Sequence, residues 1–473
     1  MTPSKPSPNP SPGVARARLW ALAATSIGTF ITVLSGSITN IALPTIVTSL
    51  HVTSAQSIWV VNAVQLATTS TLLFLGAAGD ARGAKKLYLG GMFVFTLATL
   101  GCALAPSFGA LIVMRVIQGL GGSAVIVTIN TLNRALFSQA DLGRSVAVNT
   151  VFVAAGTASG PTIGGLILAF APWPWIFALN VPLGILALVL GWRYLPEIPA
   201  TGAKLDFYSA ALAAAGFGAS FYALDGFARP NPGLGIAAFG AAGIVTMALF
   251  IHRQLHLTHP MLAVELFRVP IFSVSVLIST ATYTAQGLAY VTLPFFFQNV
   301  LGKTPFESGL LLSAWPLVSL FVAMRMGPLS DRHSASLLCT IGILVMGGGL
   351  ACFALLPTIP ATLAIVGCSA LAGAGFATFQ TPNNRAIIVA APPEKTGRAA
   401  GVMTTARLSG QTLGAVLAAI IFEIAGSAAA TGGVPVRSVI EVSLIVACGC
   451  IAIAAVLSSF RLRAGAPPSP AQA

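Results

Sequence analysis

Three ionisable residues stand inside long apolar runs of the sequence: Arg115, Arg407 and Glu423. Of the eleven acidic residues, only Glu423 falls clearly within such a run. A charge at the centre of a bilayer costs about 2.5 to 3.5 kcal/mol on insertion scales, so each of the three needs a reason to be there. We predict that they serve proton coupling or supply charge to a cavity. Snorkelling of the charged end toward a membrane face is the alternative for each.

The other reactive side chains form no catalytic or metal-binding pattern. The five His residues fall in connecting segments, and the cluster at 252–259 lacks a matching Cys or carboxylate pair. The six Cys residues lie in or beside apolar runs without a CxxC spacing, which favours packing thiols. No nucleophile–base pair or phosphate-binding loop stands out. The sequence therefore predicts no metal, no cofactor and no enzyme activity.

Most of the chain is too apolar for water. Of its 473 residues, 56% are hydrophobic and 7% are charged, and the mean hydropathy is +0.89; about a quarter of the residues are charged in a soluble domain. Apolar runs of about twenty residues recur without the alternation of a barrel strand, so helices must span the bilayer. The net charge of +13 comes without a basic block, which argues against nucleic acid as a partner. We predict an all-α polytopic membrane protein.

The apolar runs divide into fourteen predicted spans, and positive charge is distributed unevenly between the two sides. With the N-terminus inside, the inner segments hold 19 of the 24 Lys and Arg residues and the outer segments hold three. This asymmetry predicts that both termini are cytoplasmic. The predicted spans are residues 20–46, 57–78, 86–105, 108–132, 145–169, 174–194, 207–226, 234–251, 271–298, 308–326, 336–356, 360–380, 399–424 and 438–459.

An internal repeat divides the spans into two halves. Asp80 follows the second span and Asp331 follows the tenth, 251 positions later, each after a Gly-containing turn. Two parallel six-helix bundles with an inserted helix pair explain this spacing. The predicted division is a disordered cytoplasmic N-terminus at 1–18, an N-terminal bundle at 19–195, the inserted pair with its linkers at 196–268, a C-terminal bundle at 269–460 and a cytoplasmic tail at 461–473.

The loops at these two aspartates have the composition of a gating latch. Glycines there permit a tight turn and close helix approach, and an Asp can accept hydrogen bonds from a helix N-terminus or from an Arg across the bundle interface. A basic loop set by topology, with the Asp as a helix cap, is the alternative. The predicted latch residues are Gly76, Asp80, Gly83, Lys85, Lys86, Asp331 and Arg332.

The fifth span carries small residues at helical spacing. Gly156, Gly160 and Gly164 recur every four residues and align one face without side chains, on which another helix can pack closely. Pro161 should bend the span, and Gly165 completes the motif. Generic packing of small residues explains the Gly spacing but not the Gly-Pro and Gly-Gly pairs together.

These segments resemble the fourteen-helix drug:proton antiporter family of the major facilitator superfamily, over nearly the whole chain. Residues 76–86 are similar to its loop motif G-x-L-A-D-R-x-G-R-K, with Gly79 and Ala81 as departures. Residues 111–122 resemble its R-x-x-Q-G-x-G motif, which includes Arg115, and residues 156–165 resemble its antiporter motif G-x-x-x-G-P-x-x-G-G. Further similar segments are 173–184, 293–298, 380–385 and 407–414. The resemblance implies the major facilitator fold and a latch that holds the outward-facing state.

The first span departs from the family at one position. Residues 34–44 align with L-D-x-T-I-V-N-V-A-L-P, but Ser35 stands where the family has Asp. We therefore expect the carrier to favour neutral, zwitterionic or anionic amphiphiles over lipophilic cations, and Ser35→Asp to gain cation export. The alternative is that Glu423 or another acid reaches the cavity. The predicted cavity residues are Ser35, Thr39, Asn40, Gln65, Gln118 and Gln411.

The resemblance also implies a function. It is secondary active export of amphiphilic drugs or metabolites in exchange for protons by alternating access, as in multidrug efflux and antibiotic resistance. The expected partners are the small amphiphilic substrate, protons and the lipid bilayer of a bacterial inner membrane, and the expected state is a monomer. A carrier that works by symport or facilitated diffusion of a small metabolite is the alternative.

Overall fold

A computed structural model describes residues 12–137, 139–200, 202, 205–226, 233–257, 264–356, 361–392, 395–429 and 436–463. Helices make up nearly all of these residues. Their bounds are α1 Pro12–Leu50, α2 Ser54–Arg82, α3 Ala84–Ala103, α4 Phe108–Leu136, α5 Gln139–Phe170, α6 Trp175–Ala178, α7 Asn180–Tyr194, α8 Phe207–Gly226, α9 Leu234–His256, the 3-10 helix η1 Val264–Arg268, α10 Pro270–Phe295, the π-helix η2 Phe296–Val300, α11 Pro305–Arg332, α12 Ala335–Ala354, α13 Thr362–Val389, α14 Thr396–Ala429 and α15 Val436–Arg463.

Fourteen helical segments of the described chain are long and apolar enough to cross a membrane, which confirms the predicted fold class and number of spans. Many helices are longer than predicted. The 39 residues of α1 extend about 58 Å at 1.5 Å per residue, whereas the hydrocarbon core is about 30 Å thick. The hydropathy of a run therefore marks the membrane-crossing part of a helix and misses the ends that continue beyond it.

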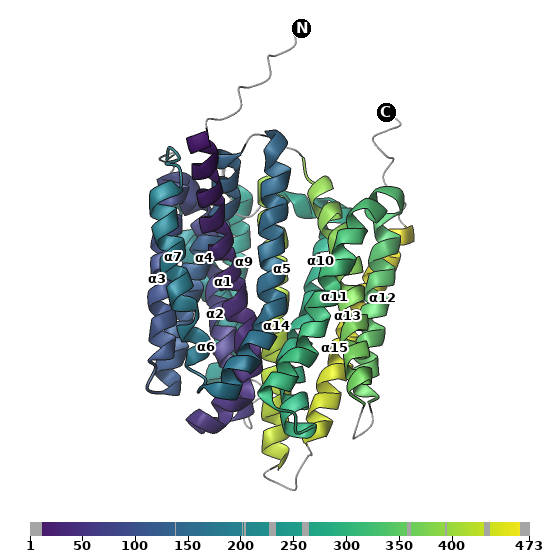
Figure 1. The fold of residues 1–473 in the computed structure, drawn as a ribbon. Helices are drawn as coiled ribbons and strands as arrows, with labels where there is room; N and C mark the ends of the chain where they lie inside the picture. The colour runs from purple at the N-terminus through teal and green to yellow at the C-terminus, as the bar shows by residue number, and fades with distance from the viewer. Residues whose placement is uncertain are drawn as a thin grey trace.

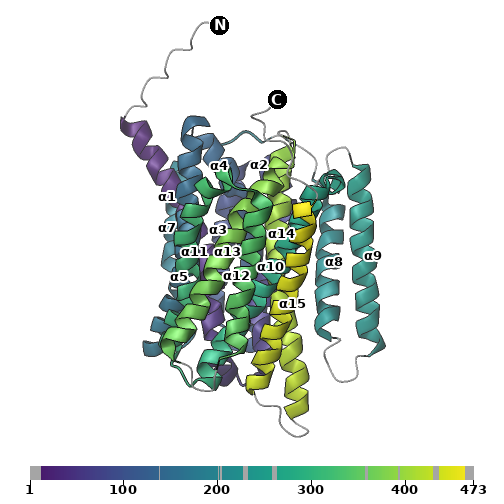
Figure 2. The same cartoon turned by 90° about the vertical axis from the view of Figure 1, so that its right-hand side faces the viewer.

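The helices form two bundles and a separate pair. Helices α1 to α7 pack against one another, as do α10 to α15, and the two groups lie side by side (Figure 1). The pair α8 and α9 stands to one side, where α8 contacts α2 and α14 (Figure 2). Helix α1 begins and α15 ends on the same face of the molecule, which we call the terminal face; the opposite one is the distal face.

The two bundles repeat the same helix packing. Gly160 and Gly164 seat α5 on α1, and Gly410 and Gly414, each 250 positions later, seat α14 on α10. A Cβ at Gly160 would lie 2.6 Å from the Ser37 side chain, and a Cβ at Gly410 would lie 2.6 Å from a backbone oxygen of α10. Because such a distance is far below van der Waals contact, both helix pairs depend on glycine for their close approach.

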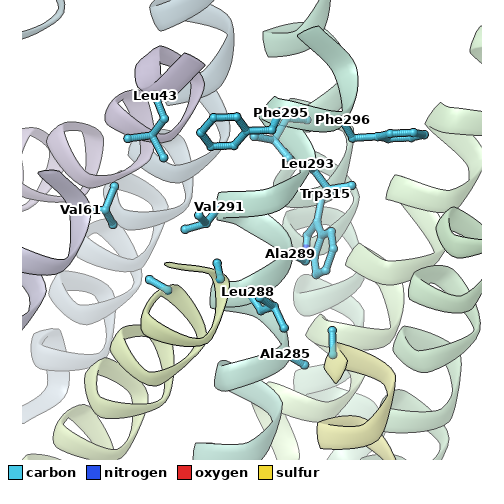
Figure 3. Close-up of a cluster of buried hydrophobic side chains, with 14 of the residues drawn as sticks. Leu43, Val61, Ala285, Leu288, Ala289, Val291, Leu293, Phe295, Phe296 and Trp315 are labelled. Carbon is cyan, nitrogen blue, oxygen red and sulfur yellow. The ribbon is translucent and has the colours of Figure 1, made fainter. Parts of the chain in front are cut away.

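Among the described residues, the buried apolar core that the two bundles share lies toward the distal face. The largest buried apolar cluster joins Leu43 and Val61 of the first bundle to Val291, Phe295 and other residues of the second (Figure 3). Two smaller clusters lie toward the terminal face, and each belongs to one bundle. Buried apolar contact is the main force that holds helices of a bundle together at such a seam. The structure is therefore closed between the bundles at the distal face.

A polar cluster ties the two inserted helices together near the terminal face. Asp206 precedes α8, accepts a hydrogen bond from Ser209 N at 3.0 Å, and pairs with Arg253 Nε of α9 at 3.2 Å. Partial burial by itself would raise the pKa of Asp206, but the hydrogen bonds from Ser209 and Arg253 and the charge of Arg253 bring that pKa below its ordinary value. Asp206 thus caps α8 and holds α9 beside it.

Candidate substrate cavity

A cavity of about 210 Å³ lies between the two bundles. Helices α1, α2, α4 and α5 form one wall, and α10, α11 and α14 form the other. Val61, Val291 and Leu312 line it and also belong to the apolar core shared by the two bundles. The shared core therefore closes the distal side of the cavity.

Three polar atoms in the cavity wall are buried without a hydrogen-bond partner among the described residues: Asn40 Oδ1, Gln65 Oε1 and Arg407 Nε. Leaving a buried polar atom unpaired costs about 1 to 3 kcal/mol, so native structures satisfy nearly all of them. The three come from α1, α2 and α14, on both sides of the cavity. Residues that line the cavity from both sides thus carry two acceptors and one cationic donor that have no partner among the described residues.

Arg407 is the only charged residue in the described cavity lining. Gln411, one helical turn further along α14, also lines the cavity and donates to Gln286 Oε1 at 3.2 Å. The rest of the polar wall consists of the amides of Asn40 and Gln65 and of hydroxyl groups from Ser, Thr and Tyr side chains. The cavity therefore combines an apolar wall with scattered hydrogen-bonding groups and a single positive charge.

Pro161 shapes the wall on the α5 side. Because proline has no N–H, it cannot donate to the carbonyl of Thr157 one turn earlier. The Ser37 hydroxyl of α1 donates to this carbonyl instead, at 3.0 Å. Ser37 and Thr157 both line the cavity. The proline of the small-residue motif thus places a hydrogen bond between α1 and α5 directly in the cavity wall.

The structure divides the residues predicted for the cavity into two groups. Asn40, Gln65 and Gln411 line it, whereas Ser35, Thr39 and Gln118 are fully or almost fully buried and do not. The reason is helical rotation, since successive residues are turned by about 100° around the axis. The cavity face of α1 runs through residues 33, 36, 37 and 40, and Ser35 and Thr39 lie on another face.

Arg115 is also outside the cavity lining. It is 1% exposed and donates from Nε to Val60 O at 2.8 Å and from Nη1 to Gln118 Oε1 at 2.6 Å. Its guanidinium carbon lies 5.4 Å from the centre of the Phe177 ring, a cation–π contact. No carboxylate forms an ion pair with Arg115 among the described residues. The charge is stabilised by dipoles and an aromatic ring inside the first bundle.

Glu423 lies in a second pocket, of about 490 Å³, at the distal ends of α2, α4, α8 and α14. It does not line the central cavity. The three ionisable residues found inside apolar runs thus occupy three separate places: Arg407 in the cavity, Arg115 in a buried network and Glu423 at the distal seam between the bundles.

Comparison with known proteins assigns this architecture to a family. The sequence profile of the Major Facilitator Superfamily matches residues 25–415, and a second match covers 275–473. The chain belongs to the major facilitator superfamily. It is 43% identical to "Uncharacterized transporter YebQ" of Escherichia coli K12, over 94% of this chain and 96% of that protein. The chain is therefore a multi-pass membrane transporter and not an enzyme.

Two further relatives have names that state what they transport or resist. "Riboflavin transporter RibZ" of Clostridioides difficile is 31% identical, over 80% of this chain and 83% of its own length. "Multidrug resistance protein Stp" of Mycobacterium tuberculosis is 32% identical, over 86% of this chain and 76% of its own length. These relatives support the drug-type branch of the superfamily that the sequence motifs resemble.

The loop motif of the superfamily lies at the terminal ends of α2 and α3. Gly83 joins the two helices with a φ of +97°, a conformation that favours glycine, and Gly202 N donates to Ala81 O at 3.2 Å. Gly76 has no atom within 4 Å of a Cβ position, so it makes no close helix contact in this conformation. Asp80, Lys86 and Arg332 are exposed and Lys85 is half-buried, whereas the side chain of Asp331 is outside those described.

The antiporter motif contacts both bundles. Gly156, Gly160 and Gly164 face α1, whereas a Cβ at Gly165 would lie 2.5 Å from Pro305 O at the start of α11. On the same seam, Thr162 and Ser313 share a hydrogen bond of 2.7 Å. The motif therefore packs α5 within its own bundle and also closes α5 against α11 near the distal face.

Several cavity and closure residues were not predicted from the sequence. Ser37, Thr157 and Tyr290 line the cavity, and Gln298 Nε2 donates across the bundle interface to Ile41 O at 3.0 Å. For Ser37, its place three residues before Asn40 on one helical face was an available signal. The sequence offered no such signal for Tyr290 and Gln298, because their role depends on how α10 is rotated against the other bundle.

Proposed function

We propose that this transporter exports amphiphilic compounds in exchange for protons by alternating access. The unpaired polar atoms of Asn40, Gln65 and Arg407 carry the proposal, because these residues line one cavity from the two bundles that would move against each other. A substrate that satisfies these groups would link both bundles. The relative named as a multidrug resistance protein supports a drug or drug-like substrate.

The proposed orientation places the terminal face in the cytoplasm. It follows from the excess of Lys and Arg in the segments on that side, 19 against three. Because the bundles are closed at the distal face, this conformation would then be inward-facing. A substrate would enter the cavity from the cytoplasm or from the inner leaflet. Protons would enter from the other side after the bundles rock, as antiport in a bacterial inner membrane requires.

The charge of the cavity defines the proposed substrate class. A lipophilic cation would meet Arg407 and no counter-charge, and a desolvated charge without a partner is costly. A neutral, zwitterionic or anionic amphiphile can accept from Arg407 and donate to the amide oxygens of Asn40 and Gln65. The relative named as a riboflavin transporter supports a substrate rich in hydrogen-bonding groups.

Glu423 is the proposed proton-accepting residue. It is a carboxylate within a span, it forms no ion pair with a described residue, and it lies at the distal side of the α2–α14 seam. Protons entering from outside would reach that side first. Glu423→Gln should therefore leave substrate binding intact and uncouple export from the proton gradient.

Everted membrane vesicles test the proposal. Acidifying their interior should drive accumulation of an anionic or neutral dye by the parental transporter, because the cytoplasmic face is turned outward. Glu423→Gln should abolish the response to the gradient while downhill exchange continues. Accumulation driven by the reverse gradient would support symport, and equilibration without accumulation would support facilitated diffusion; either result would overturn the antiport proposal.

A further inference from the structure

The pocket around Glu423 has the composition of a site for an organic cation. Its described lining consists of Ala55, Gln56, Trp59, Phe108, Ile112, Tyr222 and Glu423. Glu423 is the only charged residue among them, and three of the seven are aromatic. The pocket is thus opposite in charge to the central cavity, whose only charged lining residue is Arg407.

No described residue engages the Glu423 carboxylate. Glu423 forms no ion pair or hydrogen bond with a described residue, whereas Glu441, near the same face, pairs with Arg437 at 2.8 Å. The Gln56 side chain already has a partner, since its Oε1 accepts a hydrogen bond from Thr53 N at the cap of α2. The negative charge of the pocket is therefore available to a ligand.

The aromatic residues indicate which class of ligand the pocket can bind. Rings of Trp and Tyr attract cations through their negative faces, and an ammonium group between such rings and a carboxylate gains from both contacts. The described lining offers a metal ion a single carboxylate, and it contains no His, Cys or second acidic side chain. At about 490 Å³ the pocket also has the size of a small-molecule site rather than of an ion site.

We infer that this pocket binds an amphiphilic ammonium cation, with the nitrogen between Glu423 and the rings of Trp59 and Tyr222, and with the apolar part against Phe108 and Ile112. The ligand can be an amphiphilic amine from solution or the ethanolamine headgroup of a lipid, because both present the same ammonium group. It would touch α2 and α4 of one bundle, α14 of the other and α8 of the inserted pair. Binding there should favour the conformation that is closed at the distal face.

Binding of radiolabelled benzyltrimethylammonium to the full-length transporter tests this inference. The protein is placed in nanodiscs of phosphatidylglycerol, which lacks an ammonium group. We expect saturable binding that neopentylbenzene, the neutral carbon isostere, does not compete for. Glu423→Gln should lower the affinity at least tenfold, and Tyr222→Leu should lower it about threefold. Tyr222 is 42% exposed, so this second variant keeps the test valid if Glu423→Gln fails to fold.

A control variant separates this site from others. Glu441→Gln removes a carboxylate near the same face but outside the pocket, and it should bind the probe as the parent does. Equal affinity of folded Glu423→Gln and parent, or competition by neopentylbenzene, would overturn the inference. Failure of proton-driven export would not overturn the inference, because binding of the probe is measured without a proton gradient.

A lipid arm identifies the natural source of the ammonium group. If the probe binds more weakly in nanodiscs that contain phosphatidylethanolamine, and Glu423→Gln removes this difference, the lipid headgroup occupies the pocket. If phosphatidylethanolamine has no effect on the parental affinity, the pocket is reserved for soluble amphiphilic amines. Weakening by phosphatidylethanolamine that persists in Glu423→Gln would place the lipid effect elsewhere and count against the inference.

Discussion

The hydroxyl of Ser35 lies 3.3 Å from Nη1 of Arg115, on the side of α1 that faces the interior of the first bundle. Gln118 Nε2 also donates to Ser35, at 3.2 Å. The position at which the resembled family has an aspartate thus contacts a buried guanidinium and does not line the cavity in this conformation. This contact changes what the Ser35→Asp substitution should do.

We expect Ser35→Asp to pair with Arg115 and not to gain cation export, contrary to the prediction from sequence alone. A carboxylate here would neutralise a buried charge that has no counter-ion among the described residues, so the thermal unfolding midpoint should rise by several degrees. Asn40→Asp is the matched control, because residue 40 lines the cavity. Export of a fluorescent monocation should appear in Asn40→Asp only; cation export by Ser35→Asp would show that residue 35 reaches the cavity.

Removing the charge of Arg407 should reduce transport of anionic substrates. Arg407→Gln should lower vesicle uptake of fluorescein at least tenfold, equivalent to about 1.4 kcal/mol, and affect neutral Nile red much less. Arg398→Gln is a suitable control because Arg398 is half-buried and lies 3.7 Å from Glu265, outside the cavity. An equal loss for both dyes would show that Arg407 supports the fold rather than binds the substrate.

Gly160→Ala should destabilise the first bundle. The new Cβ would lie 2.6 Å from the Ser37 side chain, and overpacking of this kind costs about 1 to 3 kcal/mol. Gly90→Ala, at a position with nothing within 4 Å, should be neutral or slightly stabilising. Thermal unfolding of the purified proteins compares them. Ser37→Gly combined with Gly160→Ala should recover part of the loss, and no recovery would contradict the assigned contact.

The Asp206 cluster should make the stability of the inserted pair depend on pH. Because the folded-state pKa of Asp206 is lowered, its contribution is fully present above the ordinary value of 3.8 and is lost as pH falls through the folded-state pKa. Asp206→Asn should therefore unfold at a lower temperature than the parent at pH 7. The difference should shrink below pH 3.8. A difference that stays constant from pH 7 to pH 3 would exclude the ionised carboxylate as its cause.

The topology predicts that both termini and the α2–α3 loop are cytoplasmic. Reporter fusions after Lys86 and after Arg463 should both be active as cytoplasmic reporters and inactive as periplasmic ones, because basic residues gather on that side. A fusion after Lys303, in the segment between η2 and α11, should give the opposite result. External activity at Lys86 would reverse the assignment of the terminal face, and with it the inward-facing interpretation.

The sequence by itself determined the class, the number of spans and the repeat. Hydrophobic length is a local property, so α8 begins at Phe207 and ends at Gly226, as predicted. The packing face of α5 could also be predicted from the sequence, because spacing alone aligns Gly156, Gly160 and Gly164 on one face. Helix ends such as that of α1 were underestimated because nothing in hydropathy marks where a helix stops once it has left the membrane.

Only the tertiary structure decided which polar residues share a cavity. Ser35 and Asn40 lie on the same span, yet one contacts Arg115 and the other lines the cavity. A rotation of α1 by about 100°, the angle of a single residue, would exchange such faces. In a membrane helix that is apolar nearly all round, sequence periodicity does not specify that rotation. It is set by the packing of α1 against α5, α7 and α10, between residues far apart in the chain.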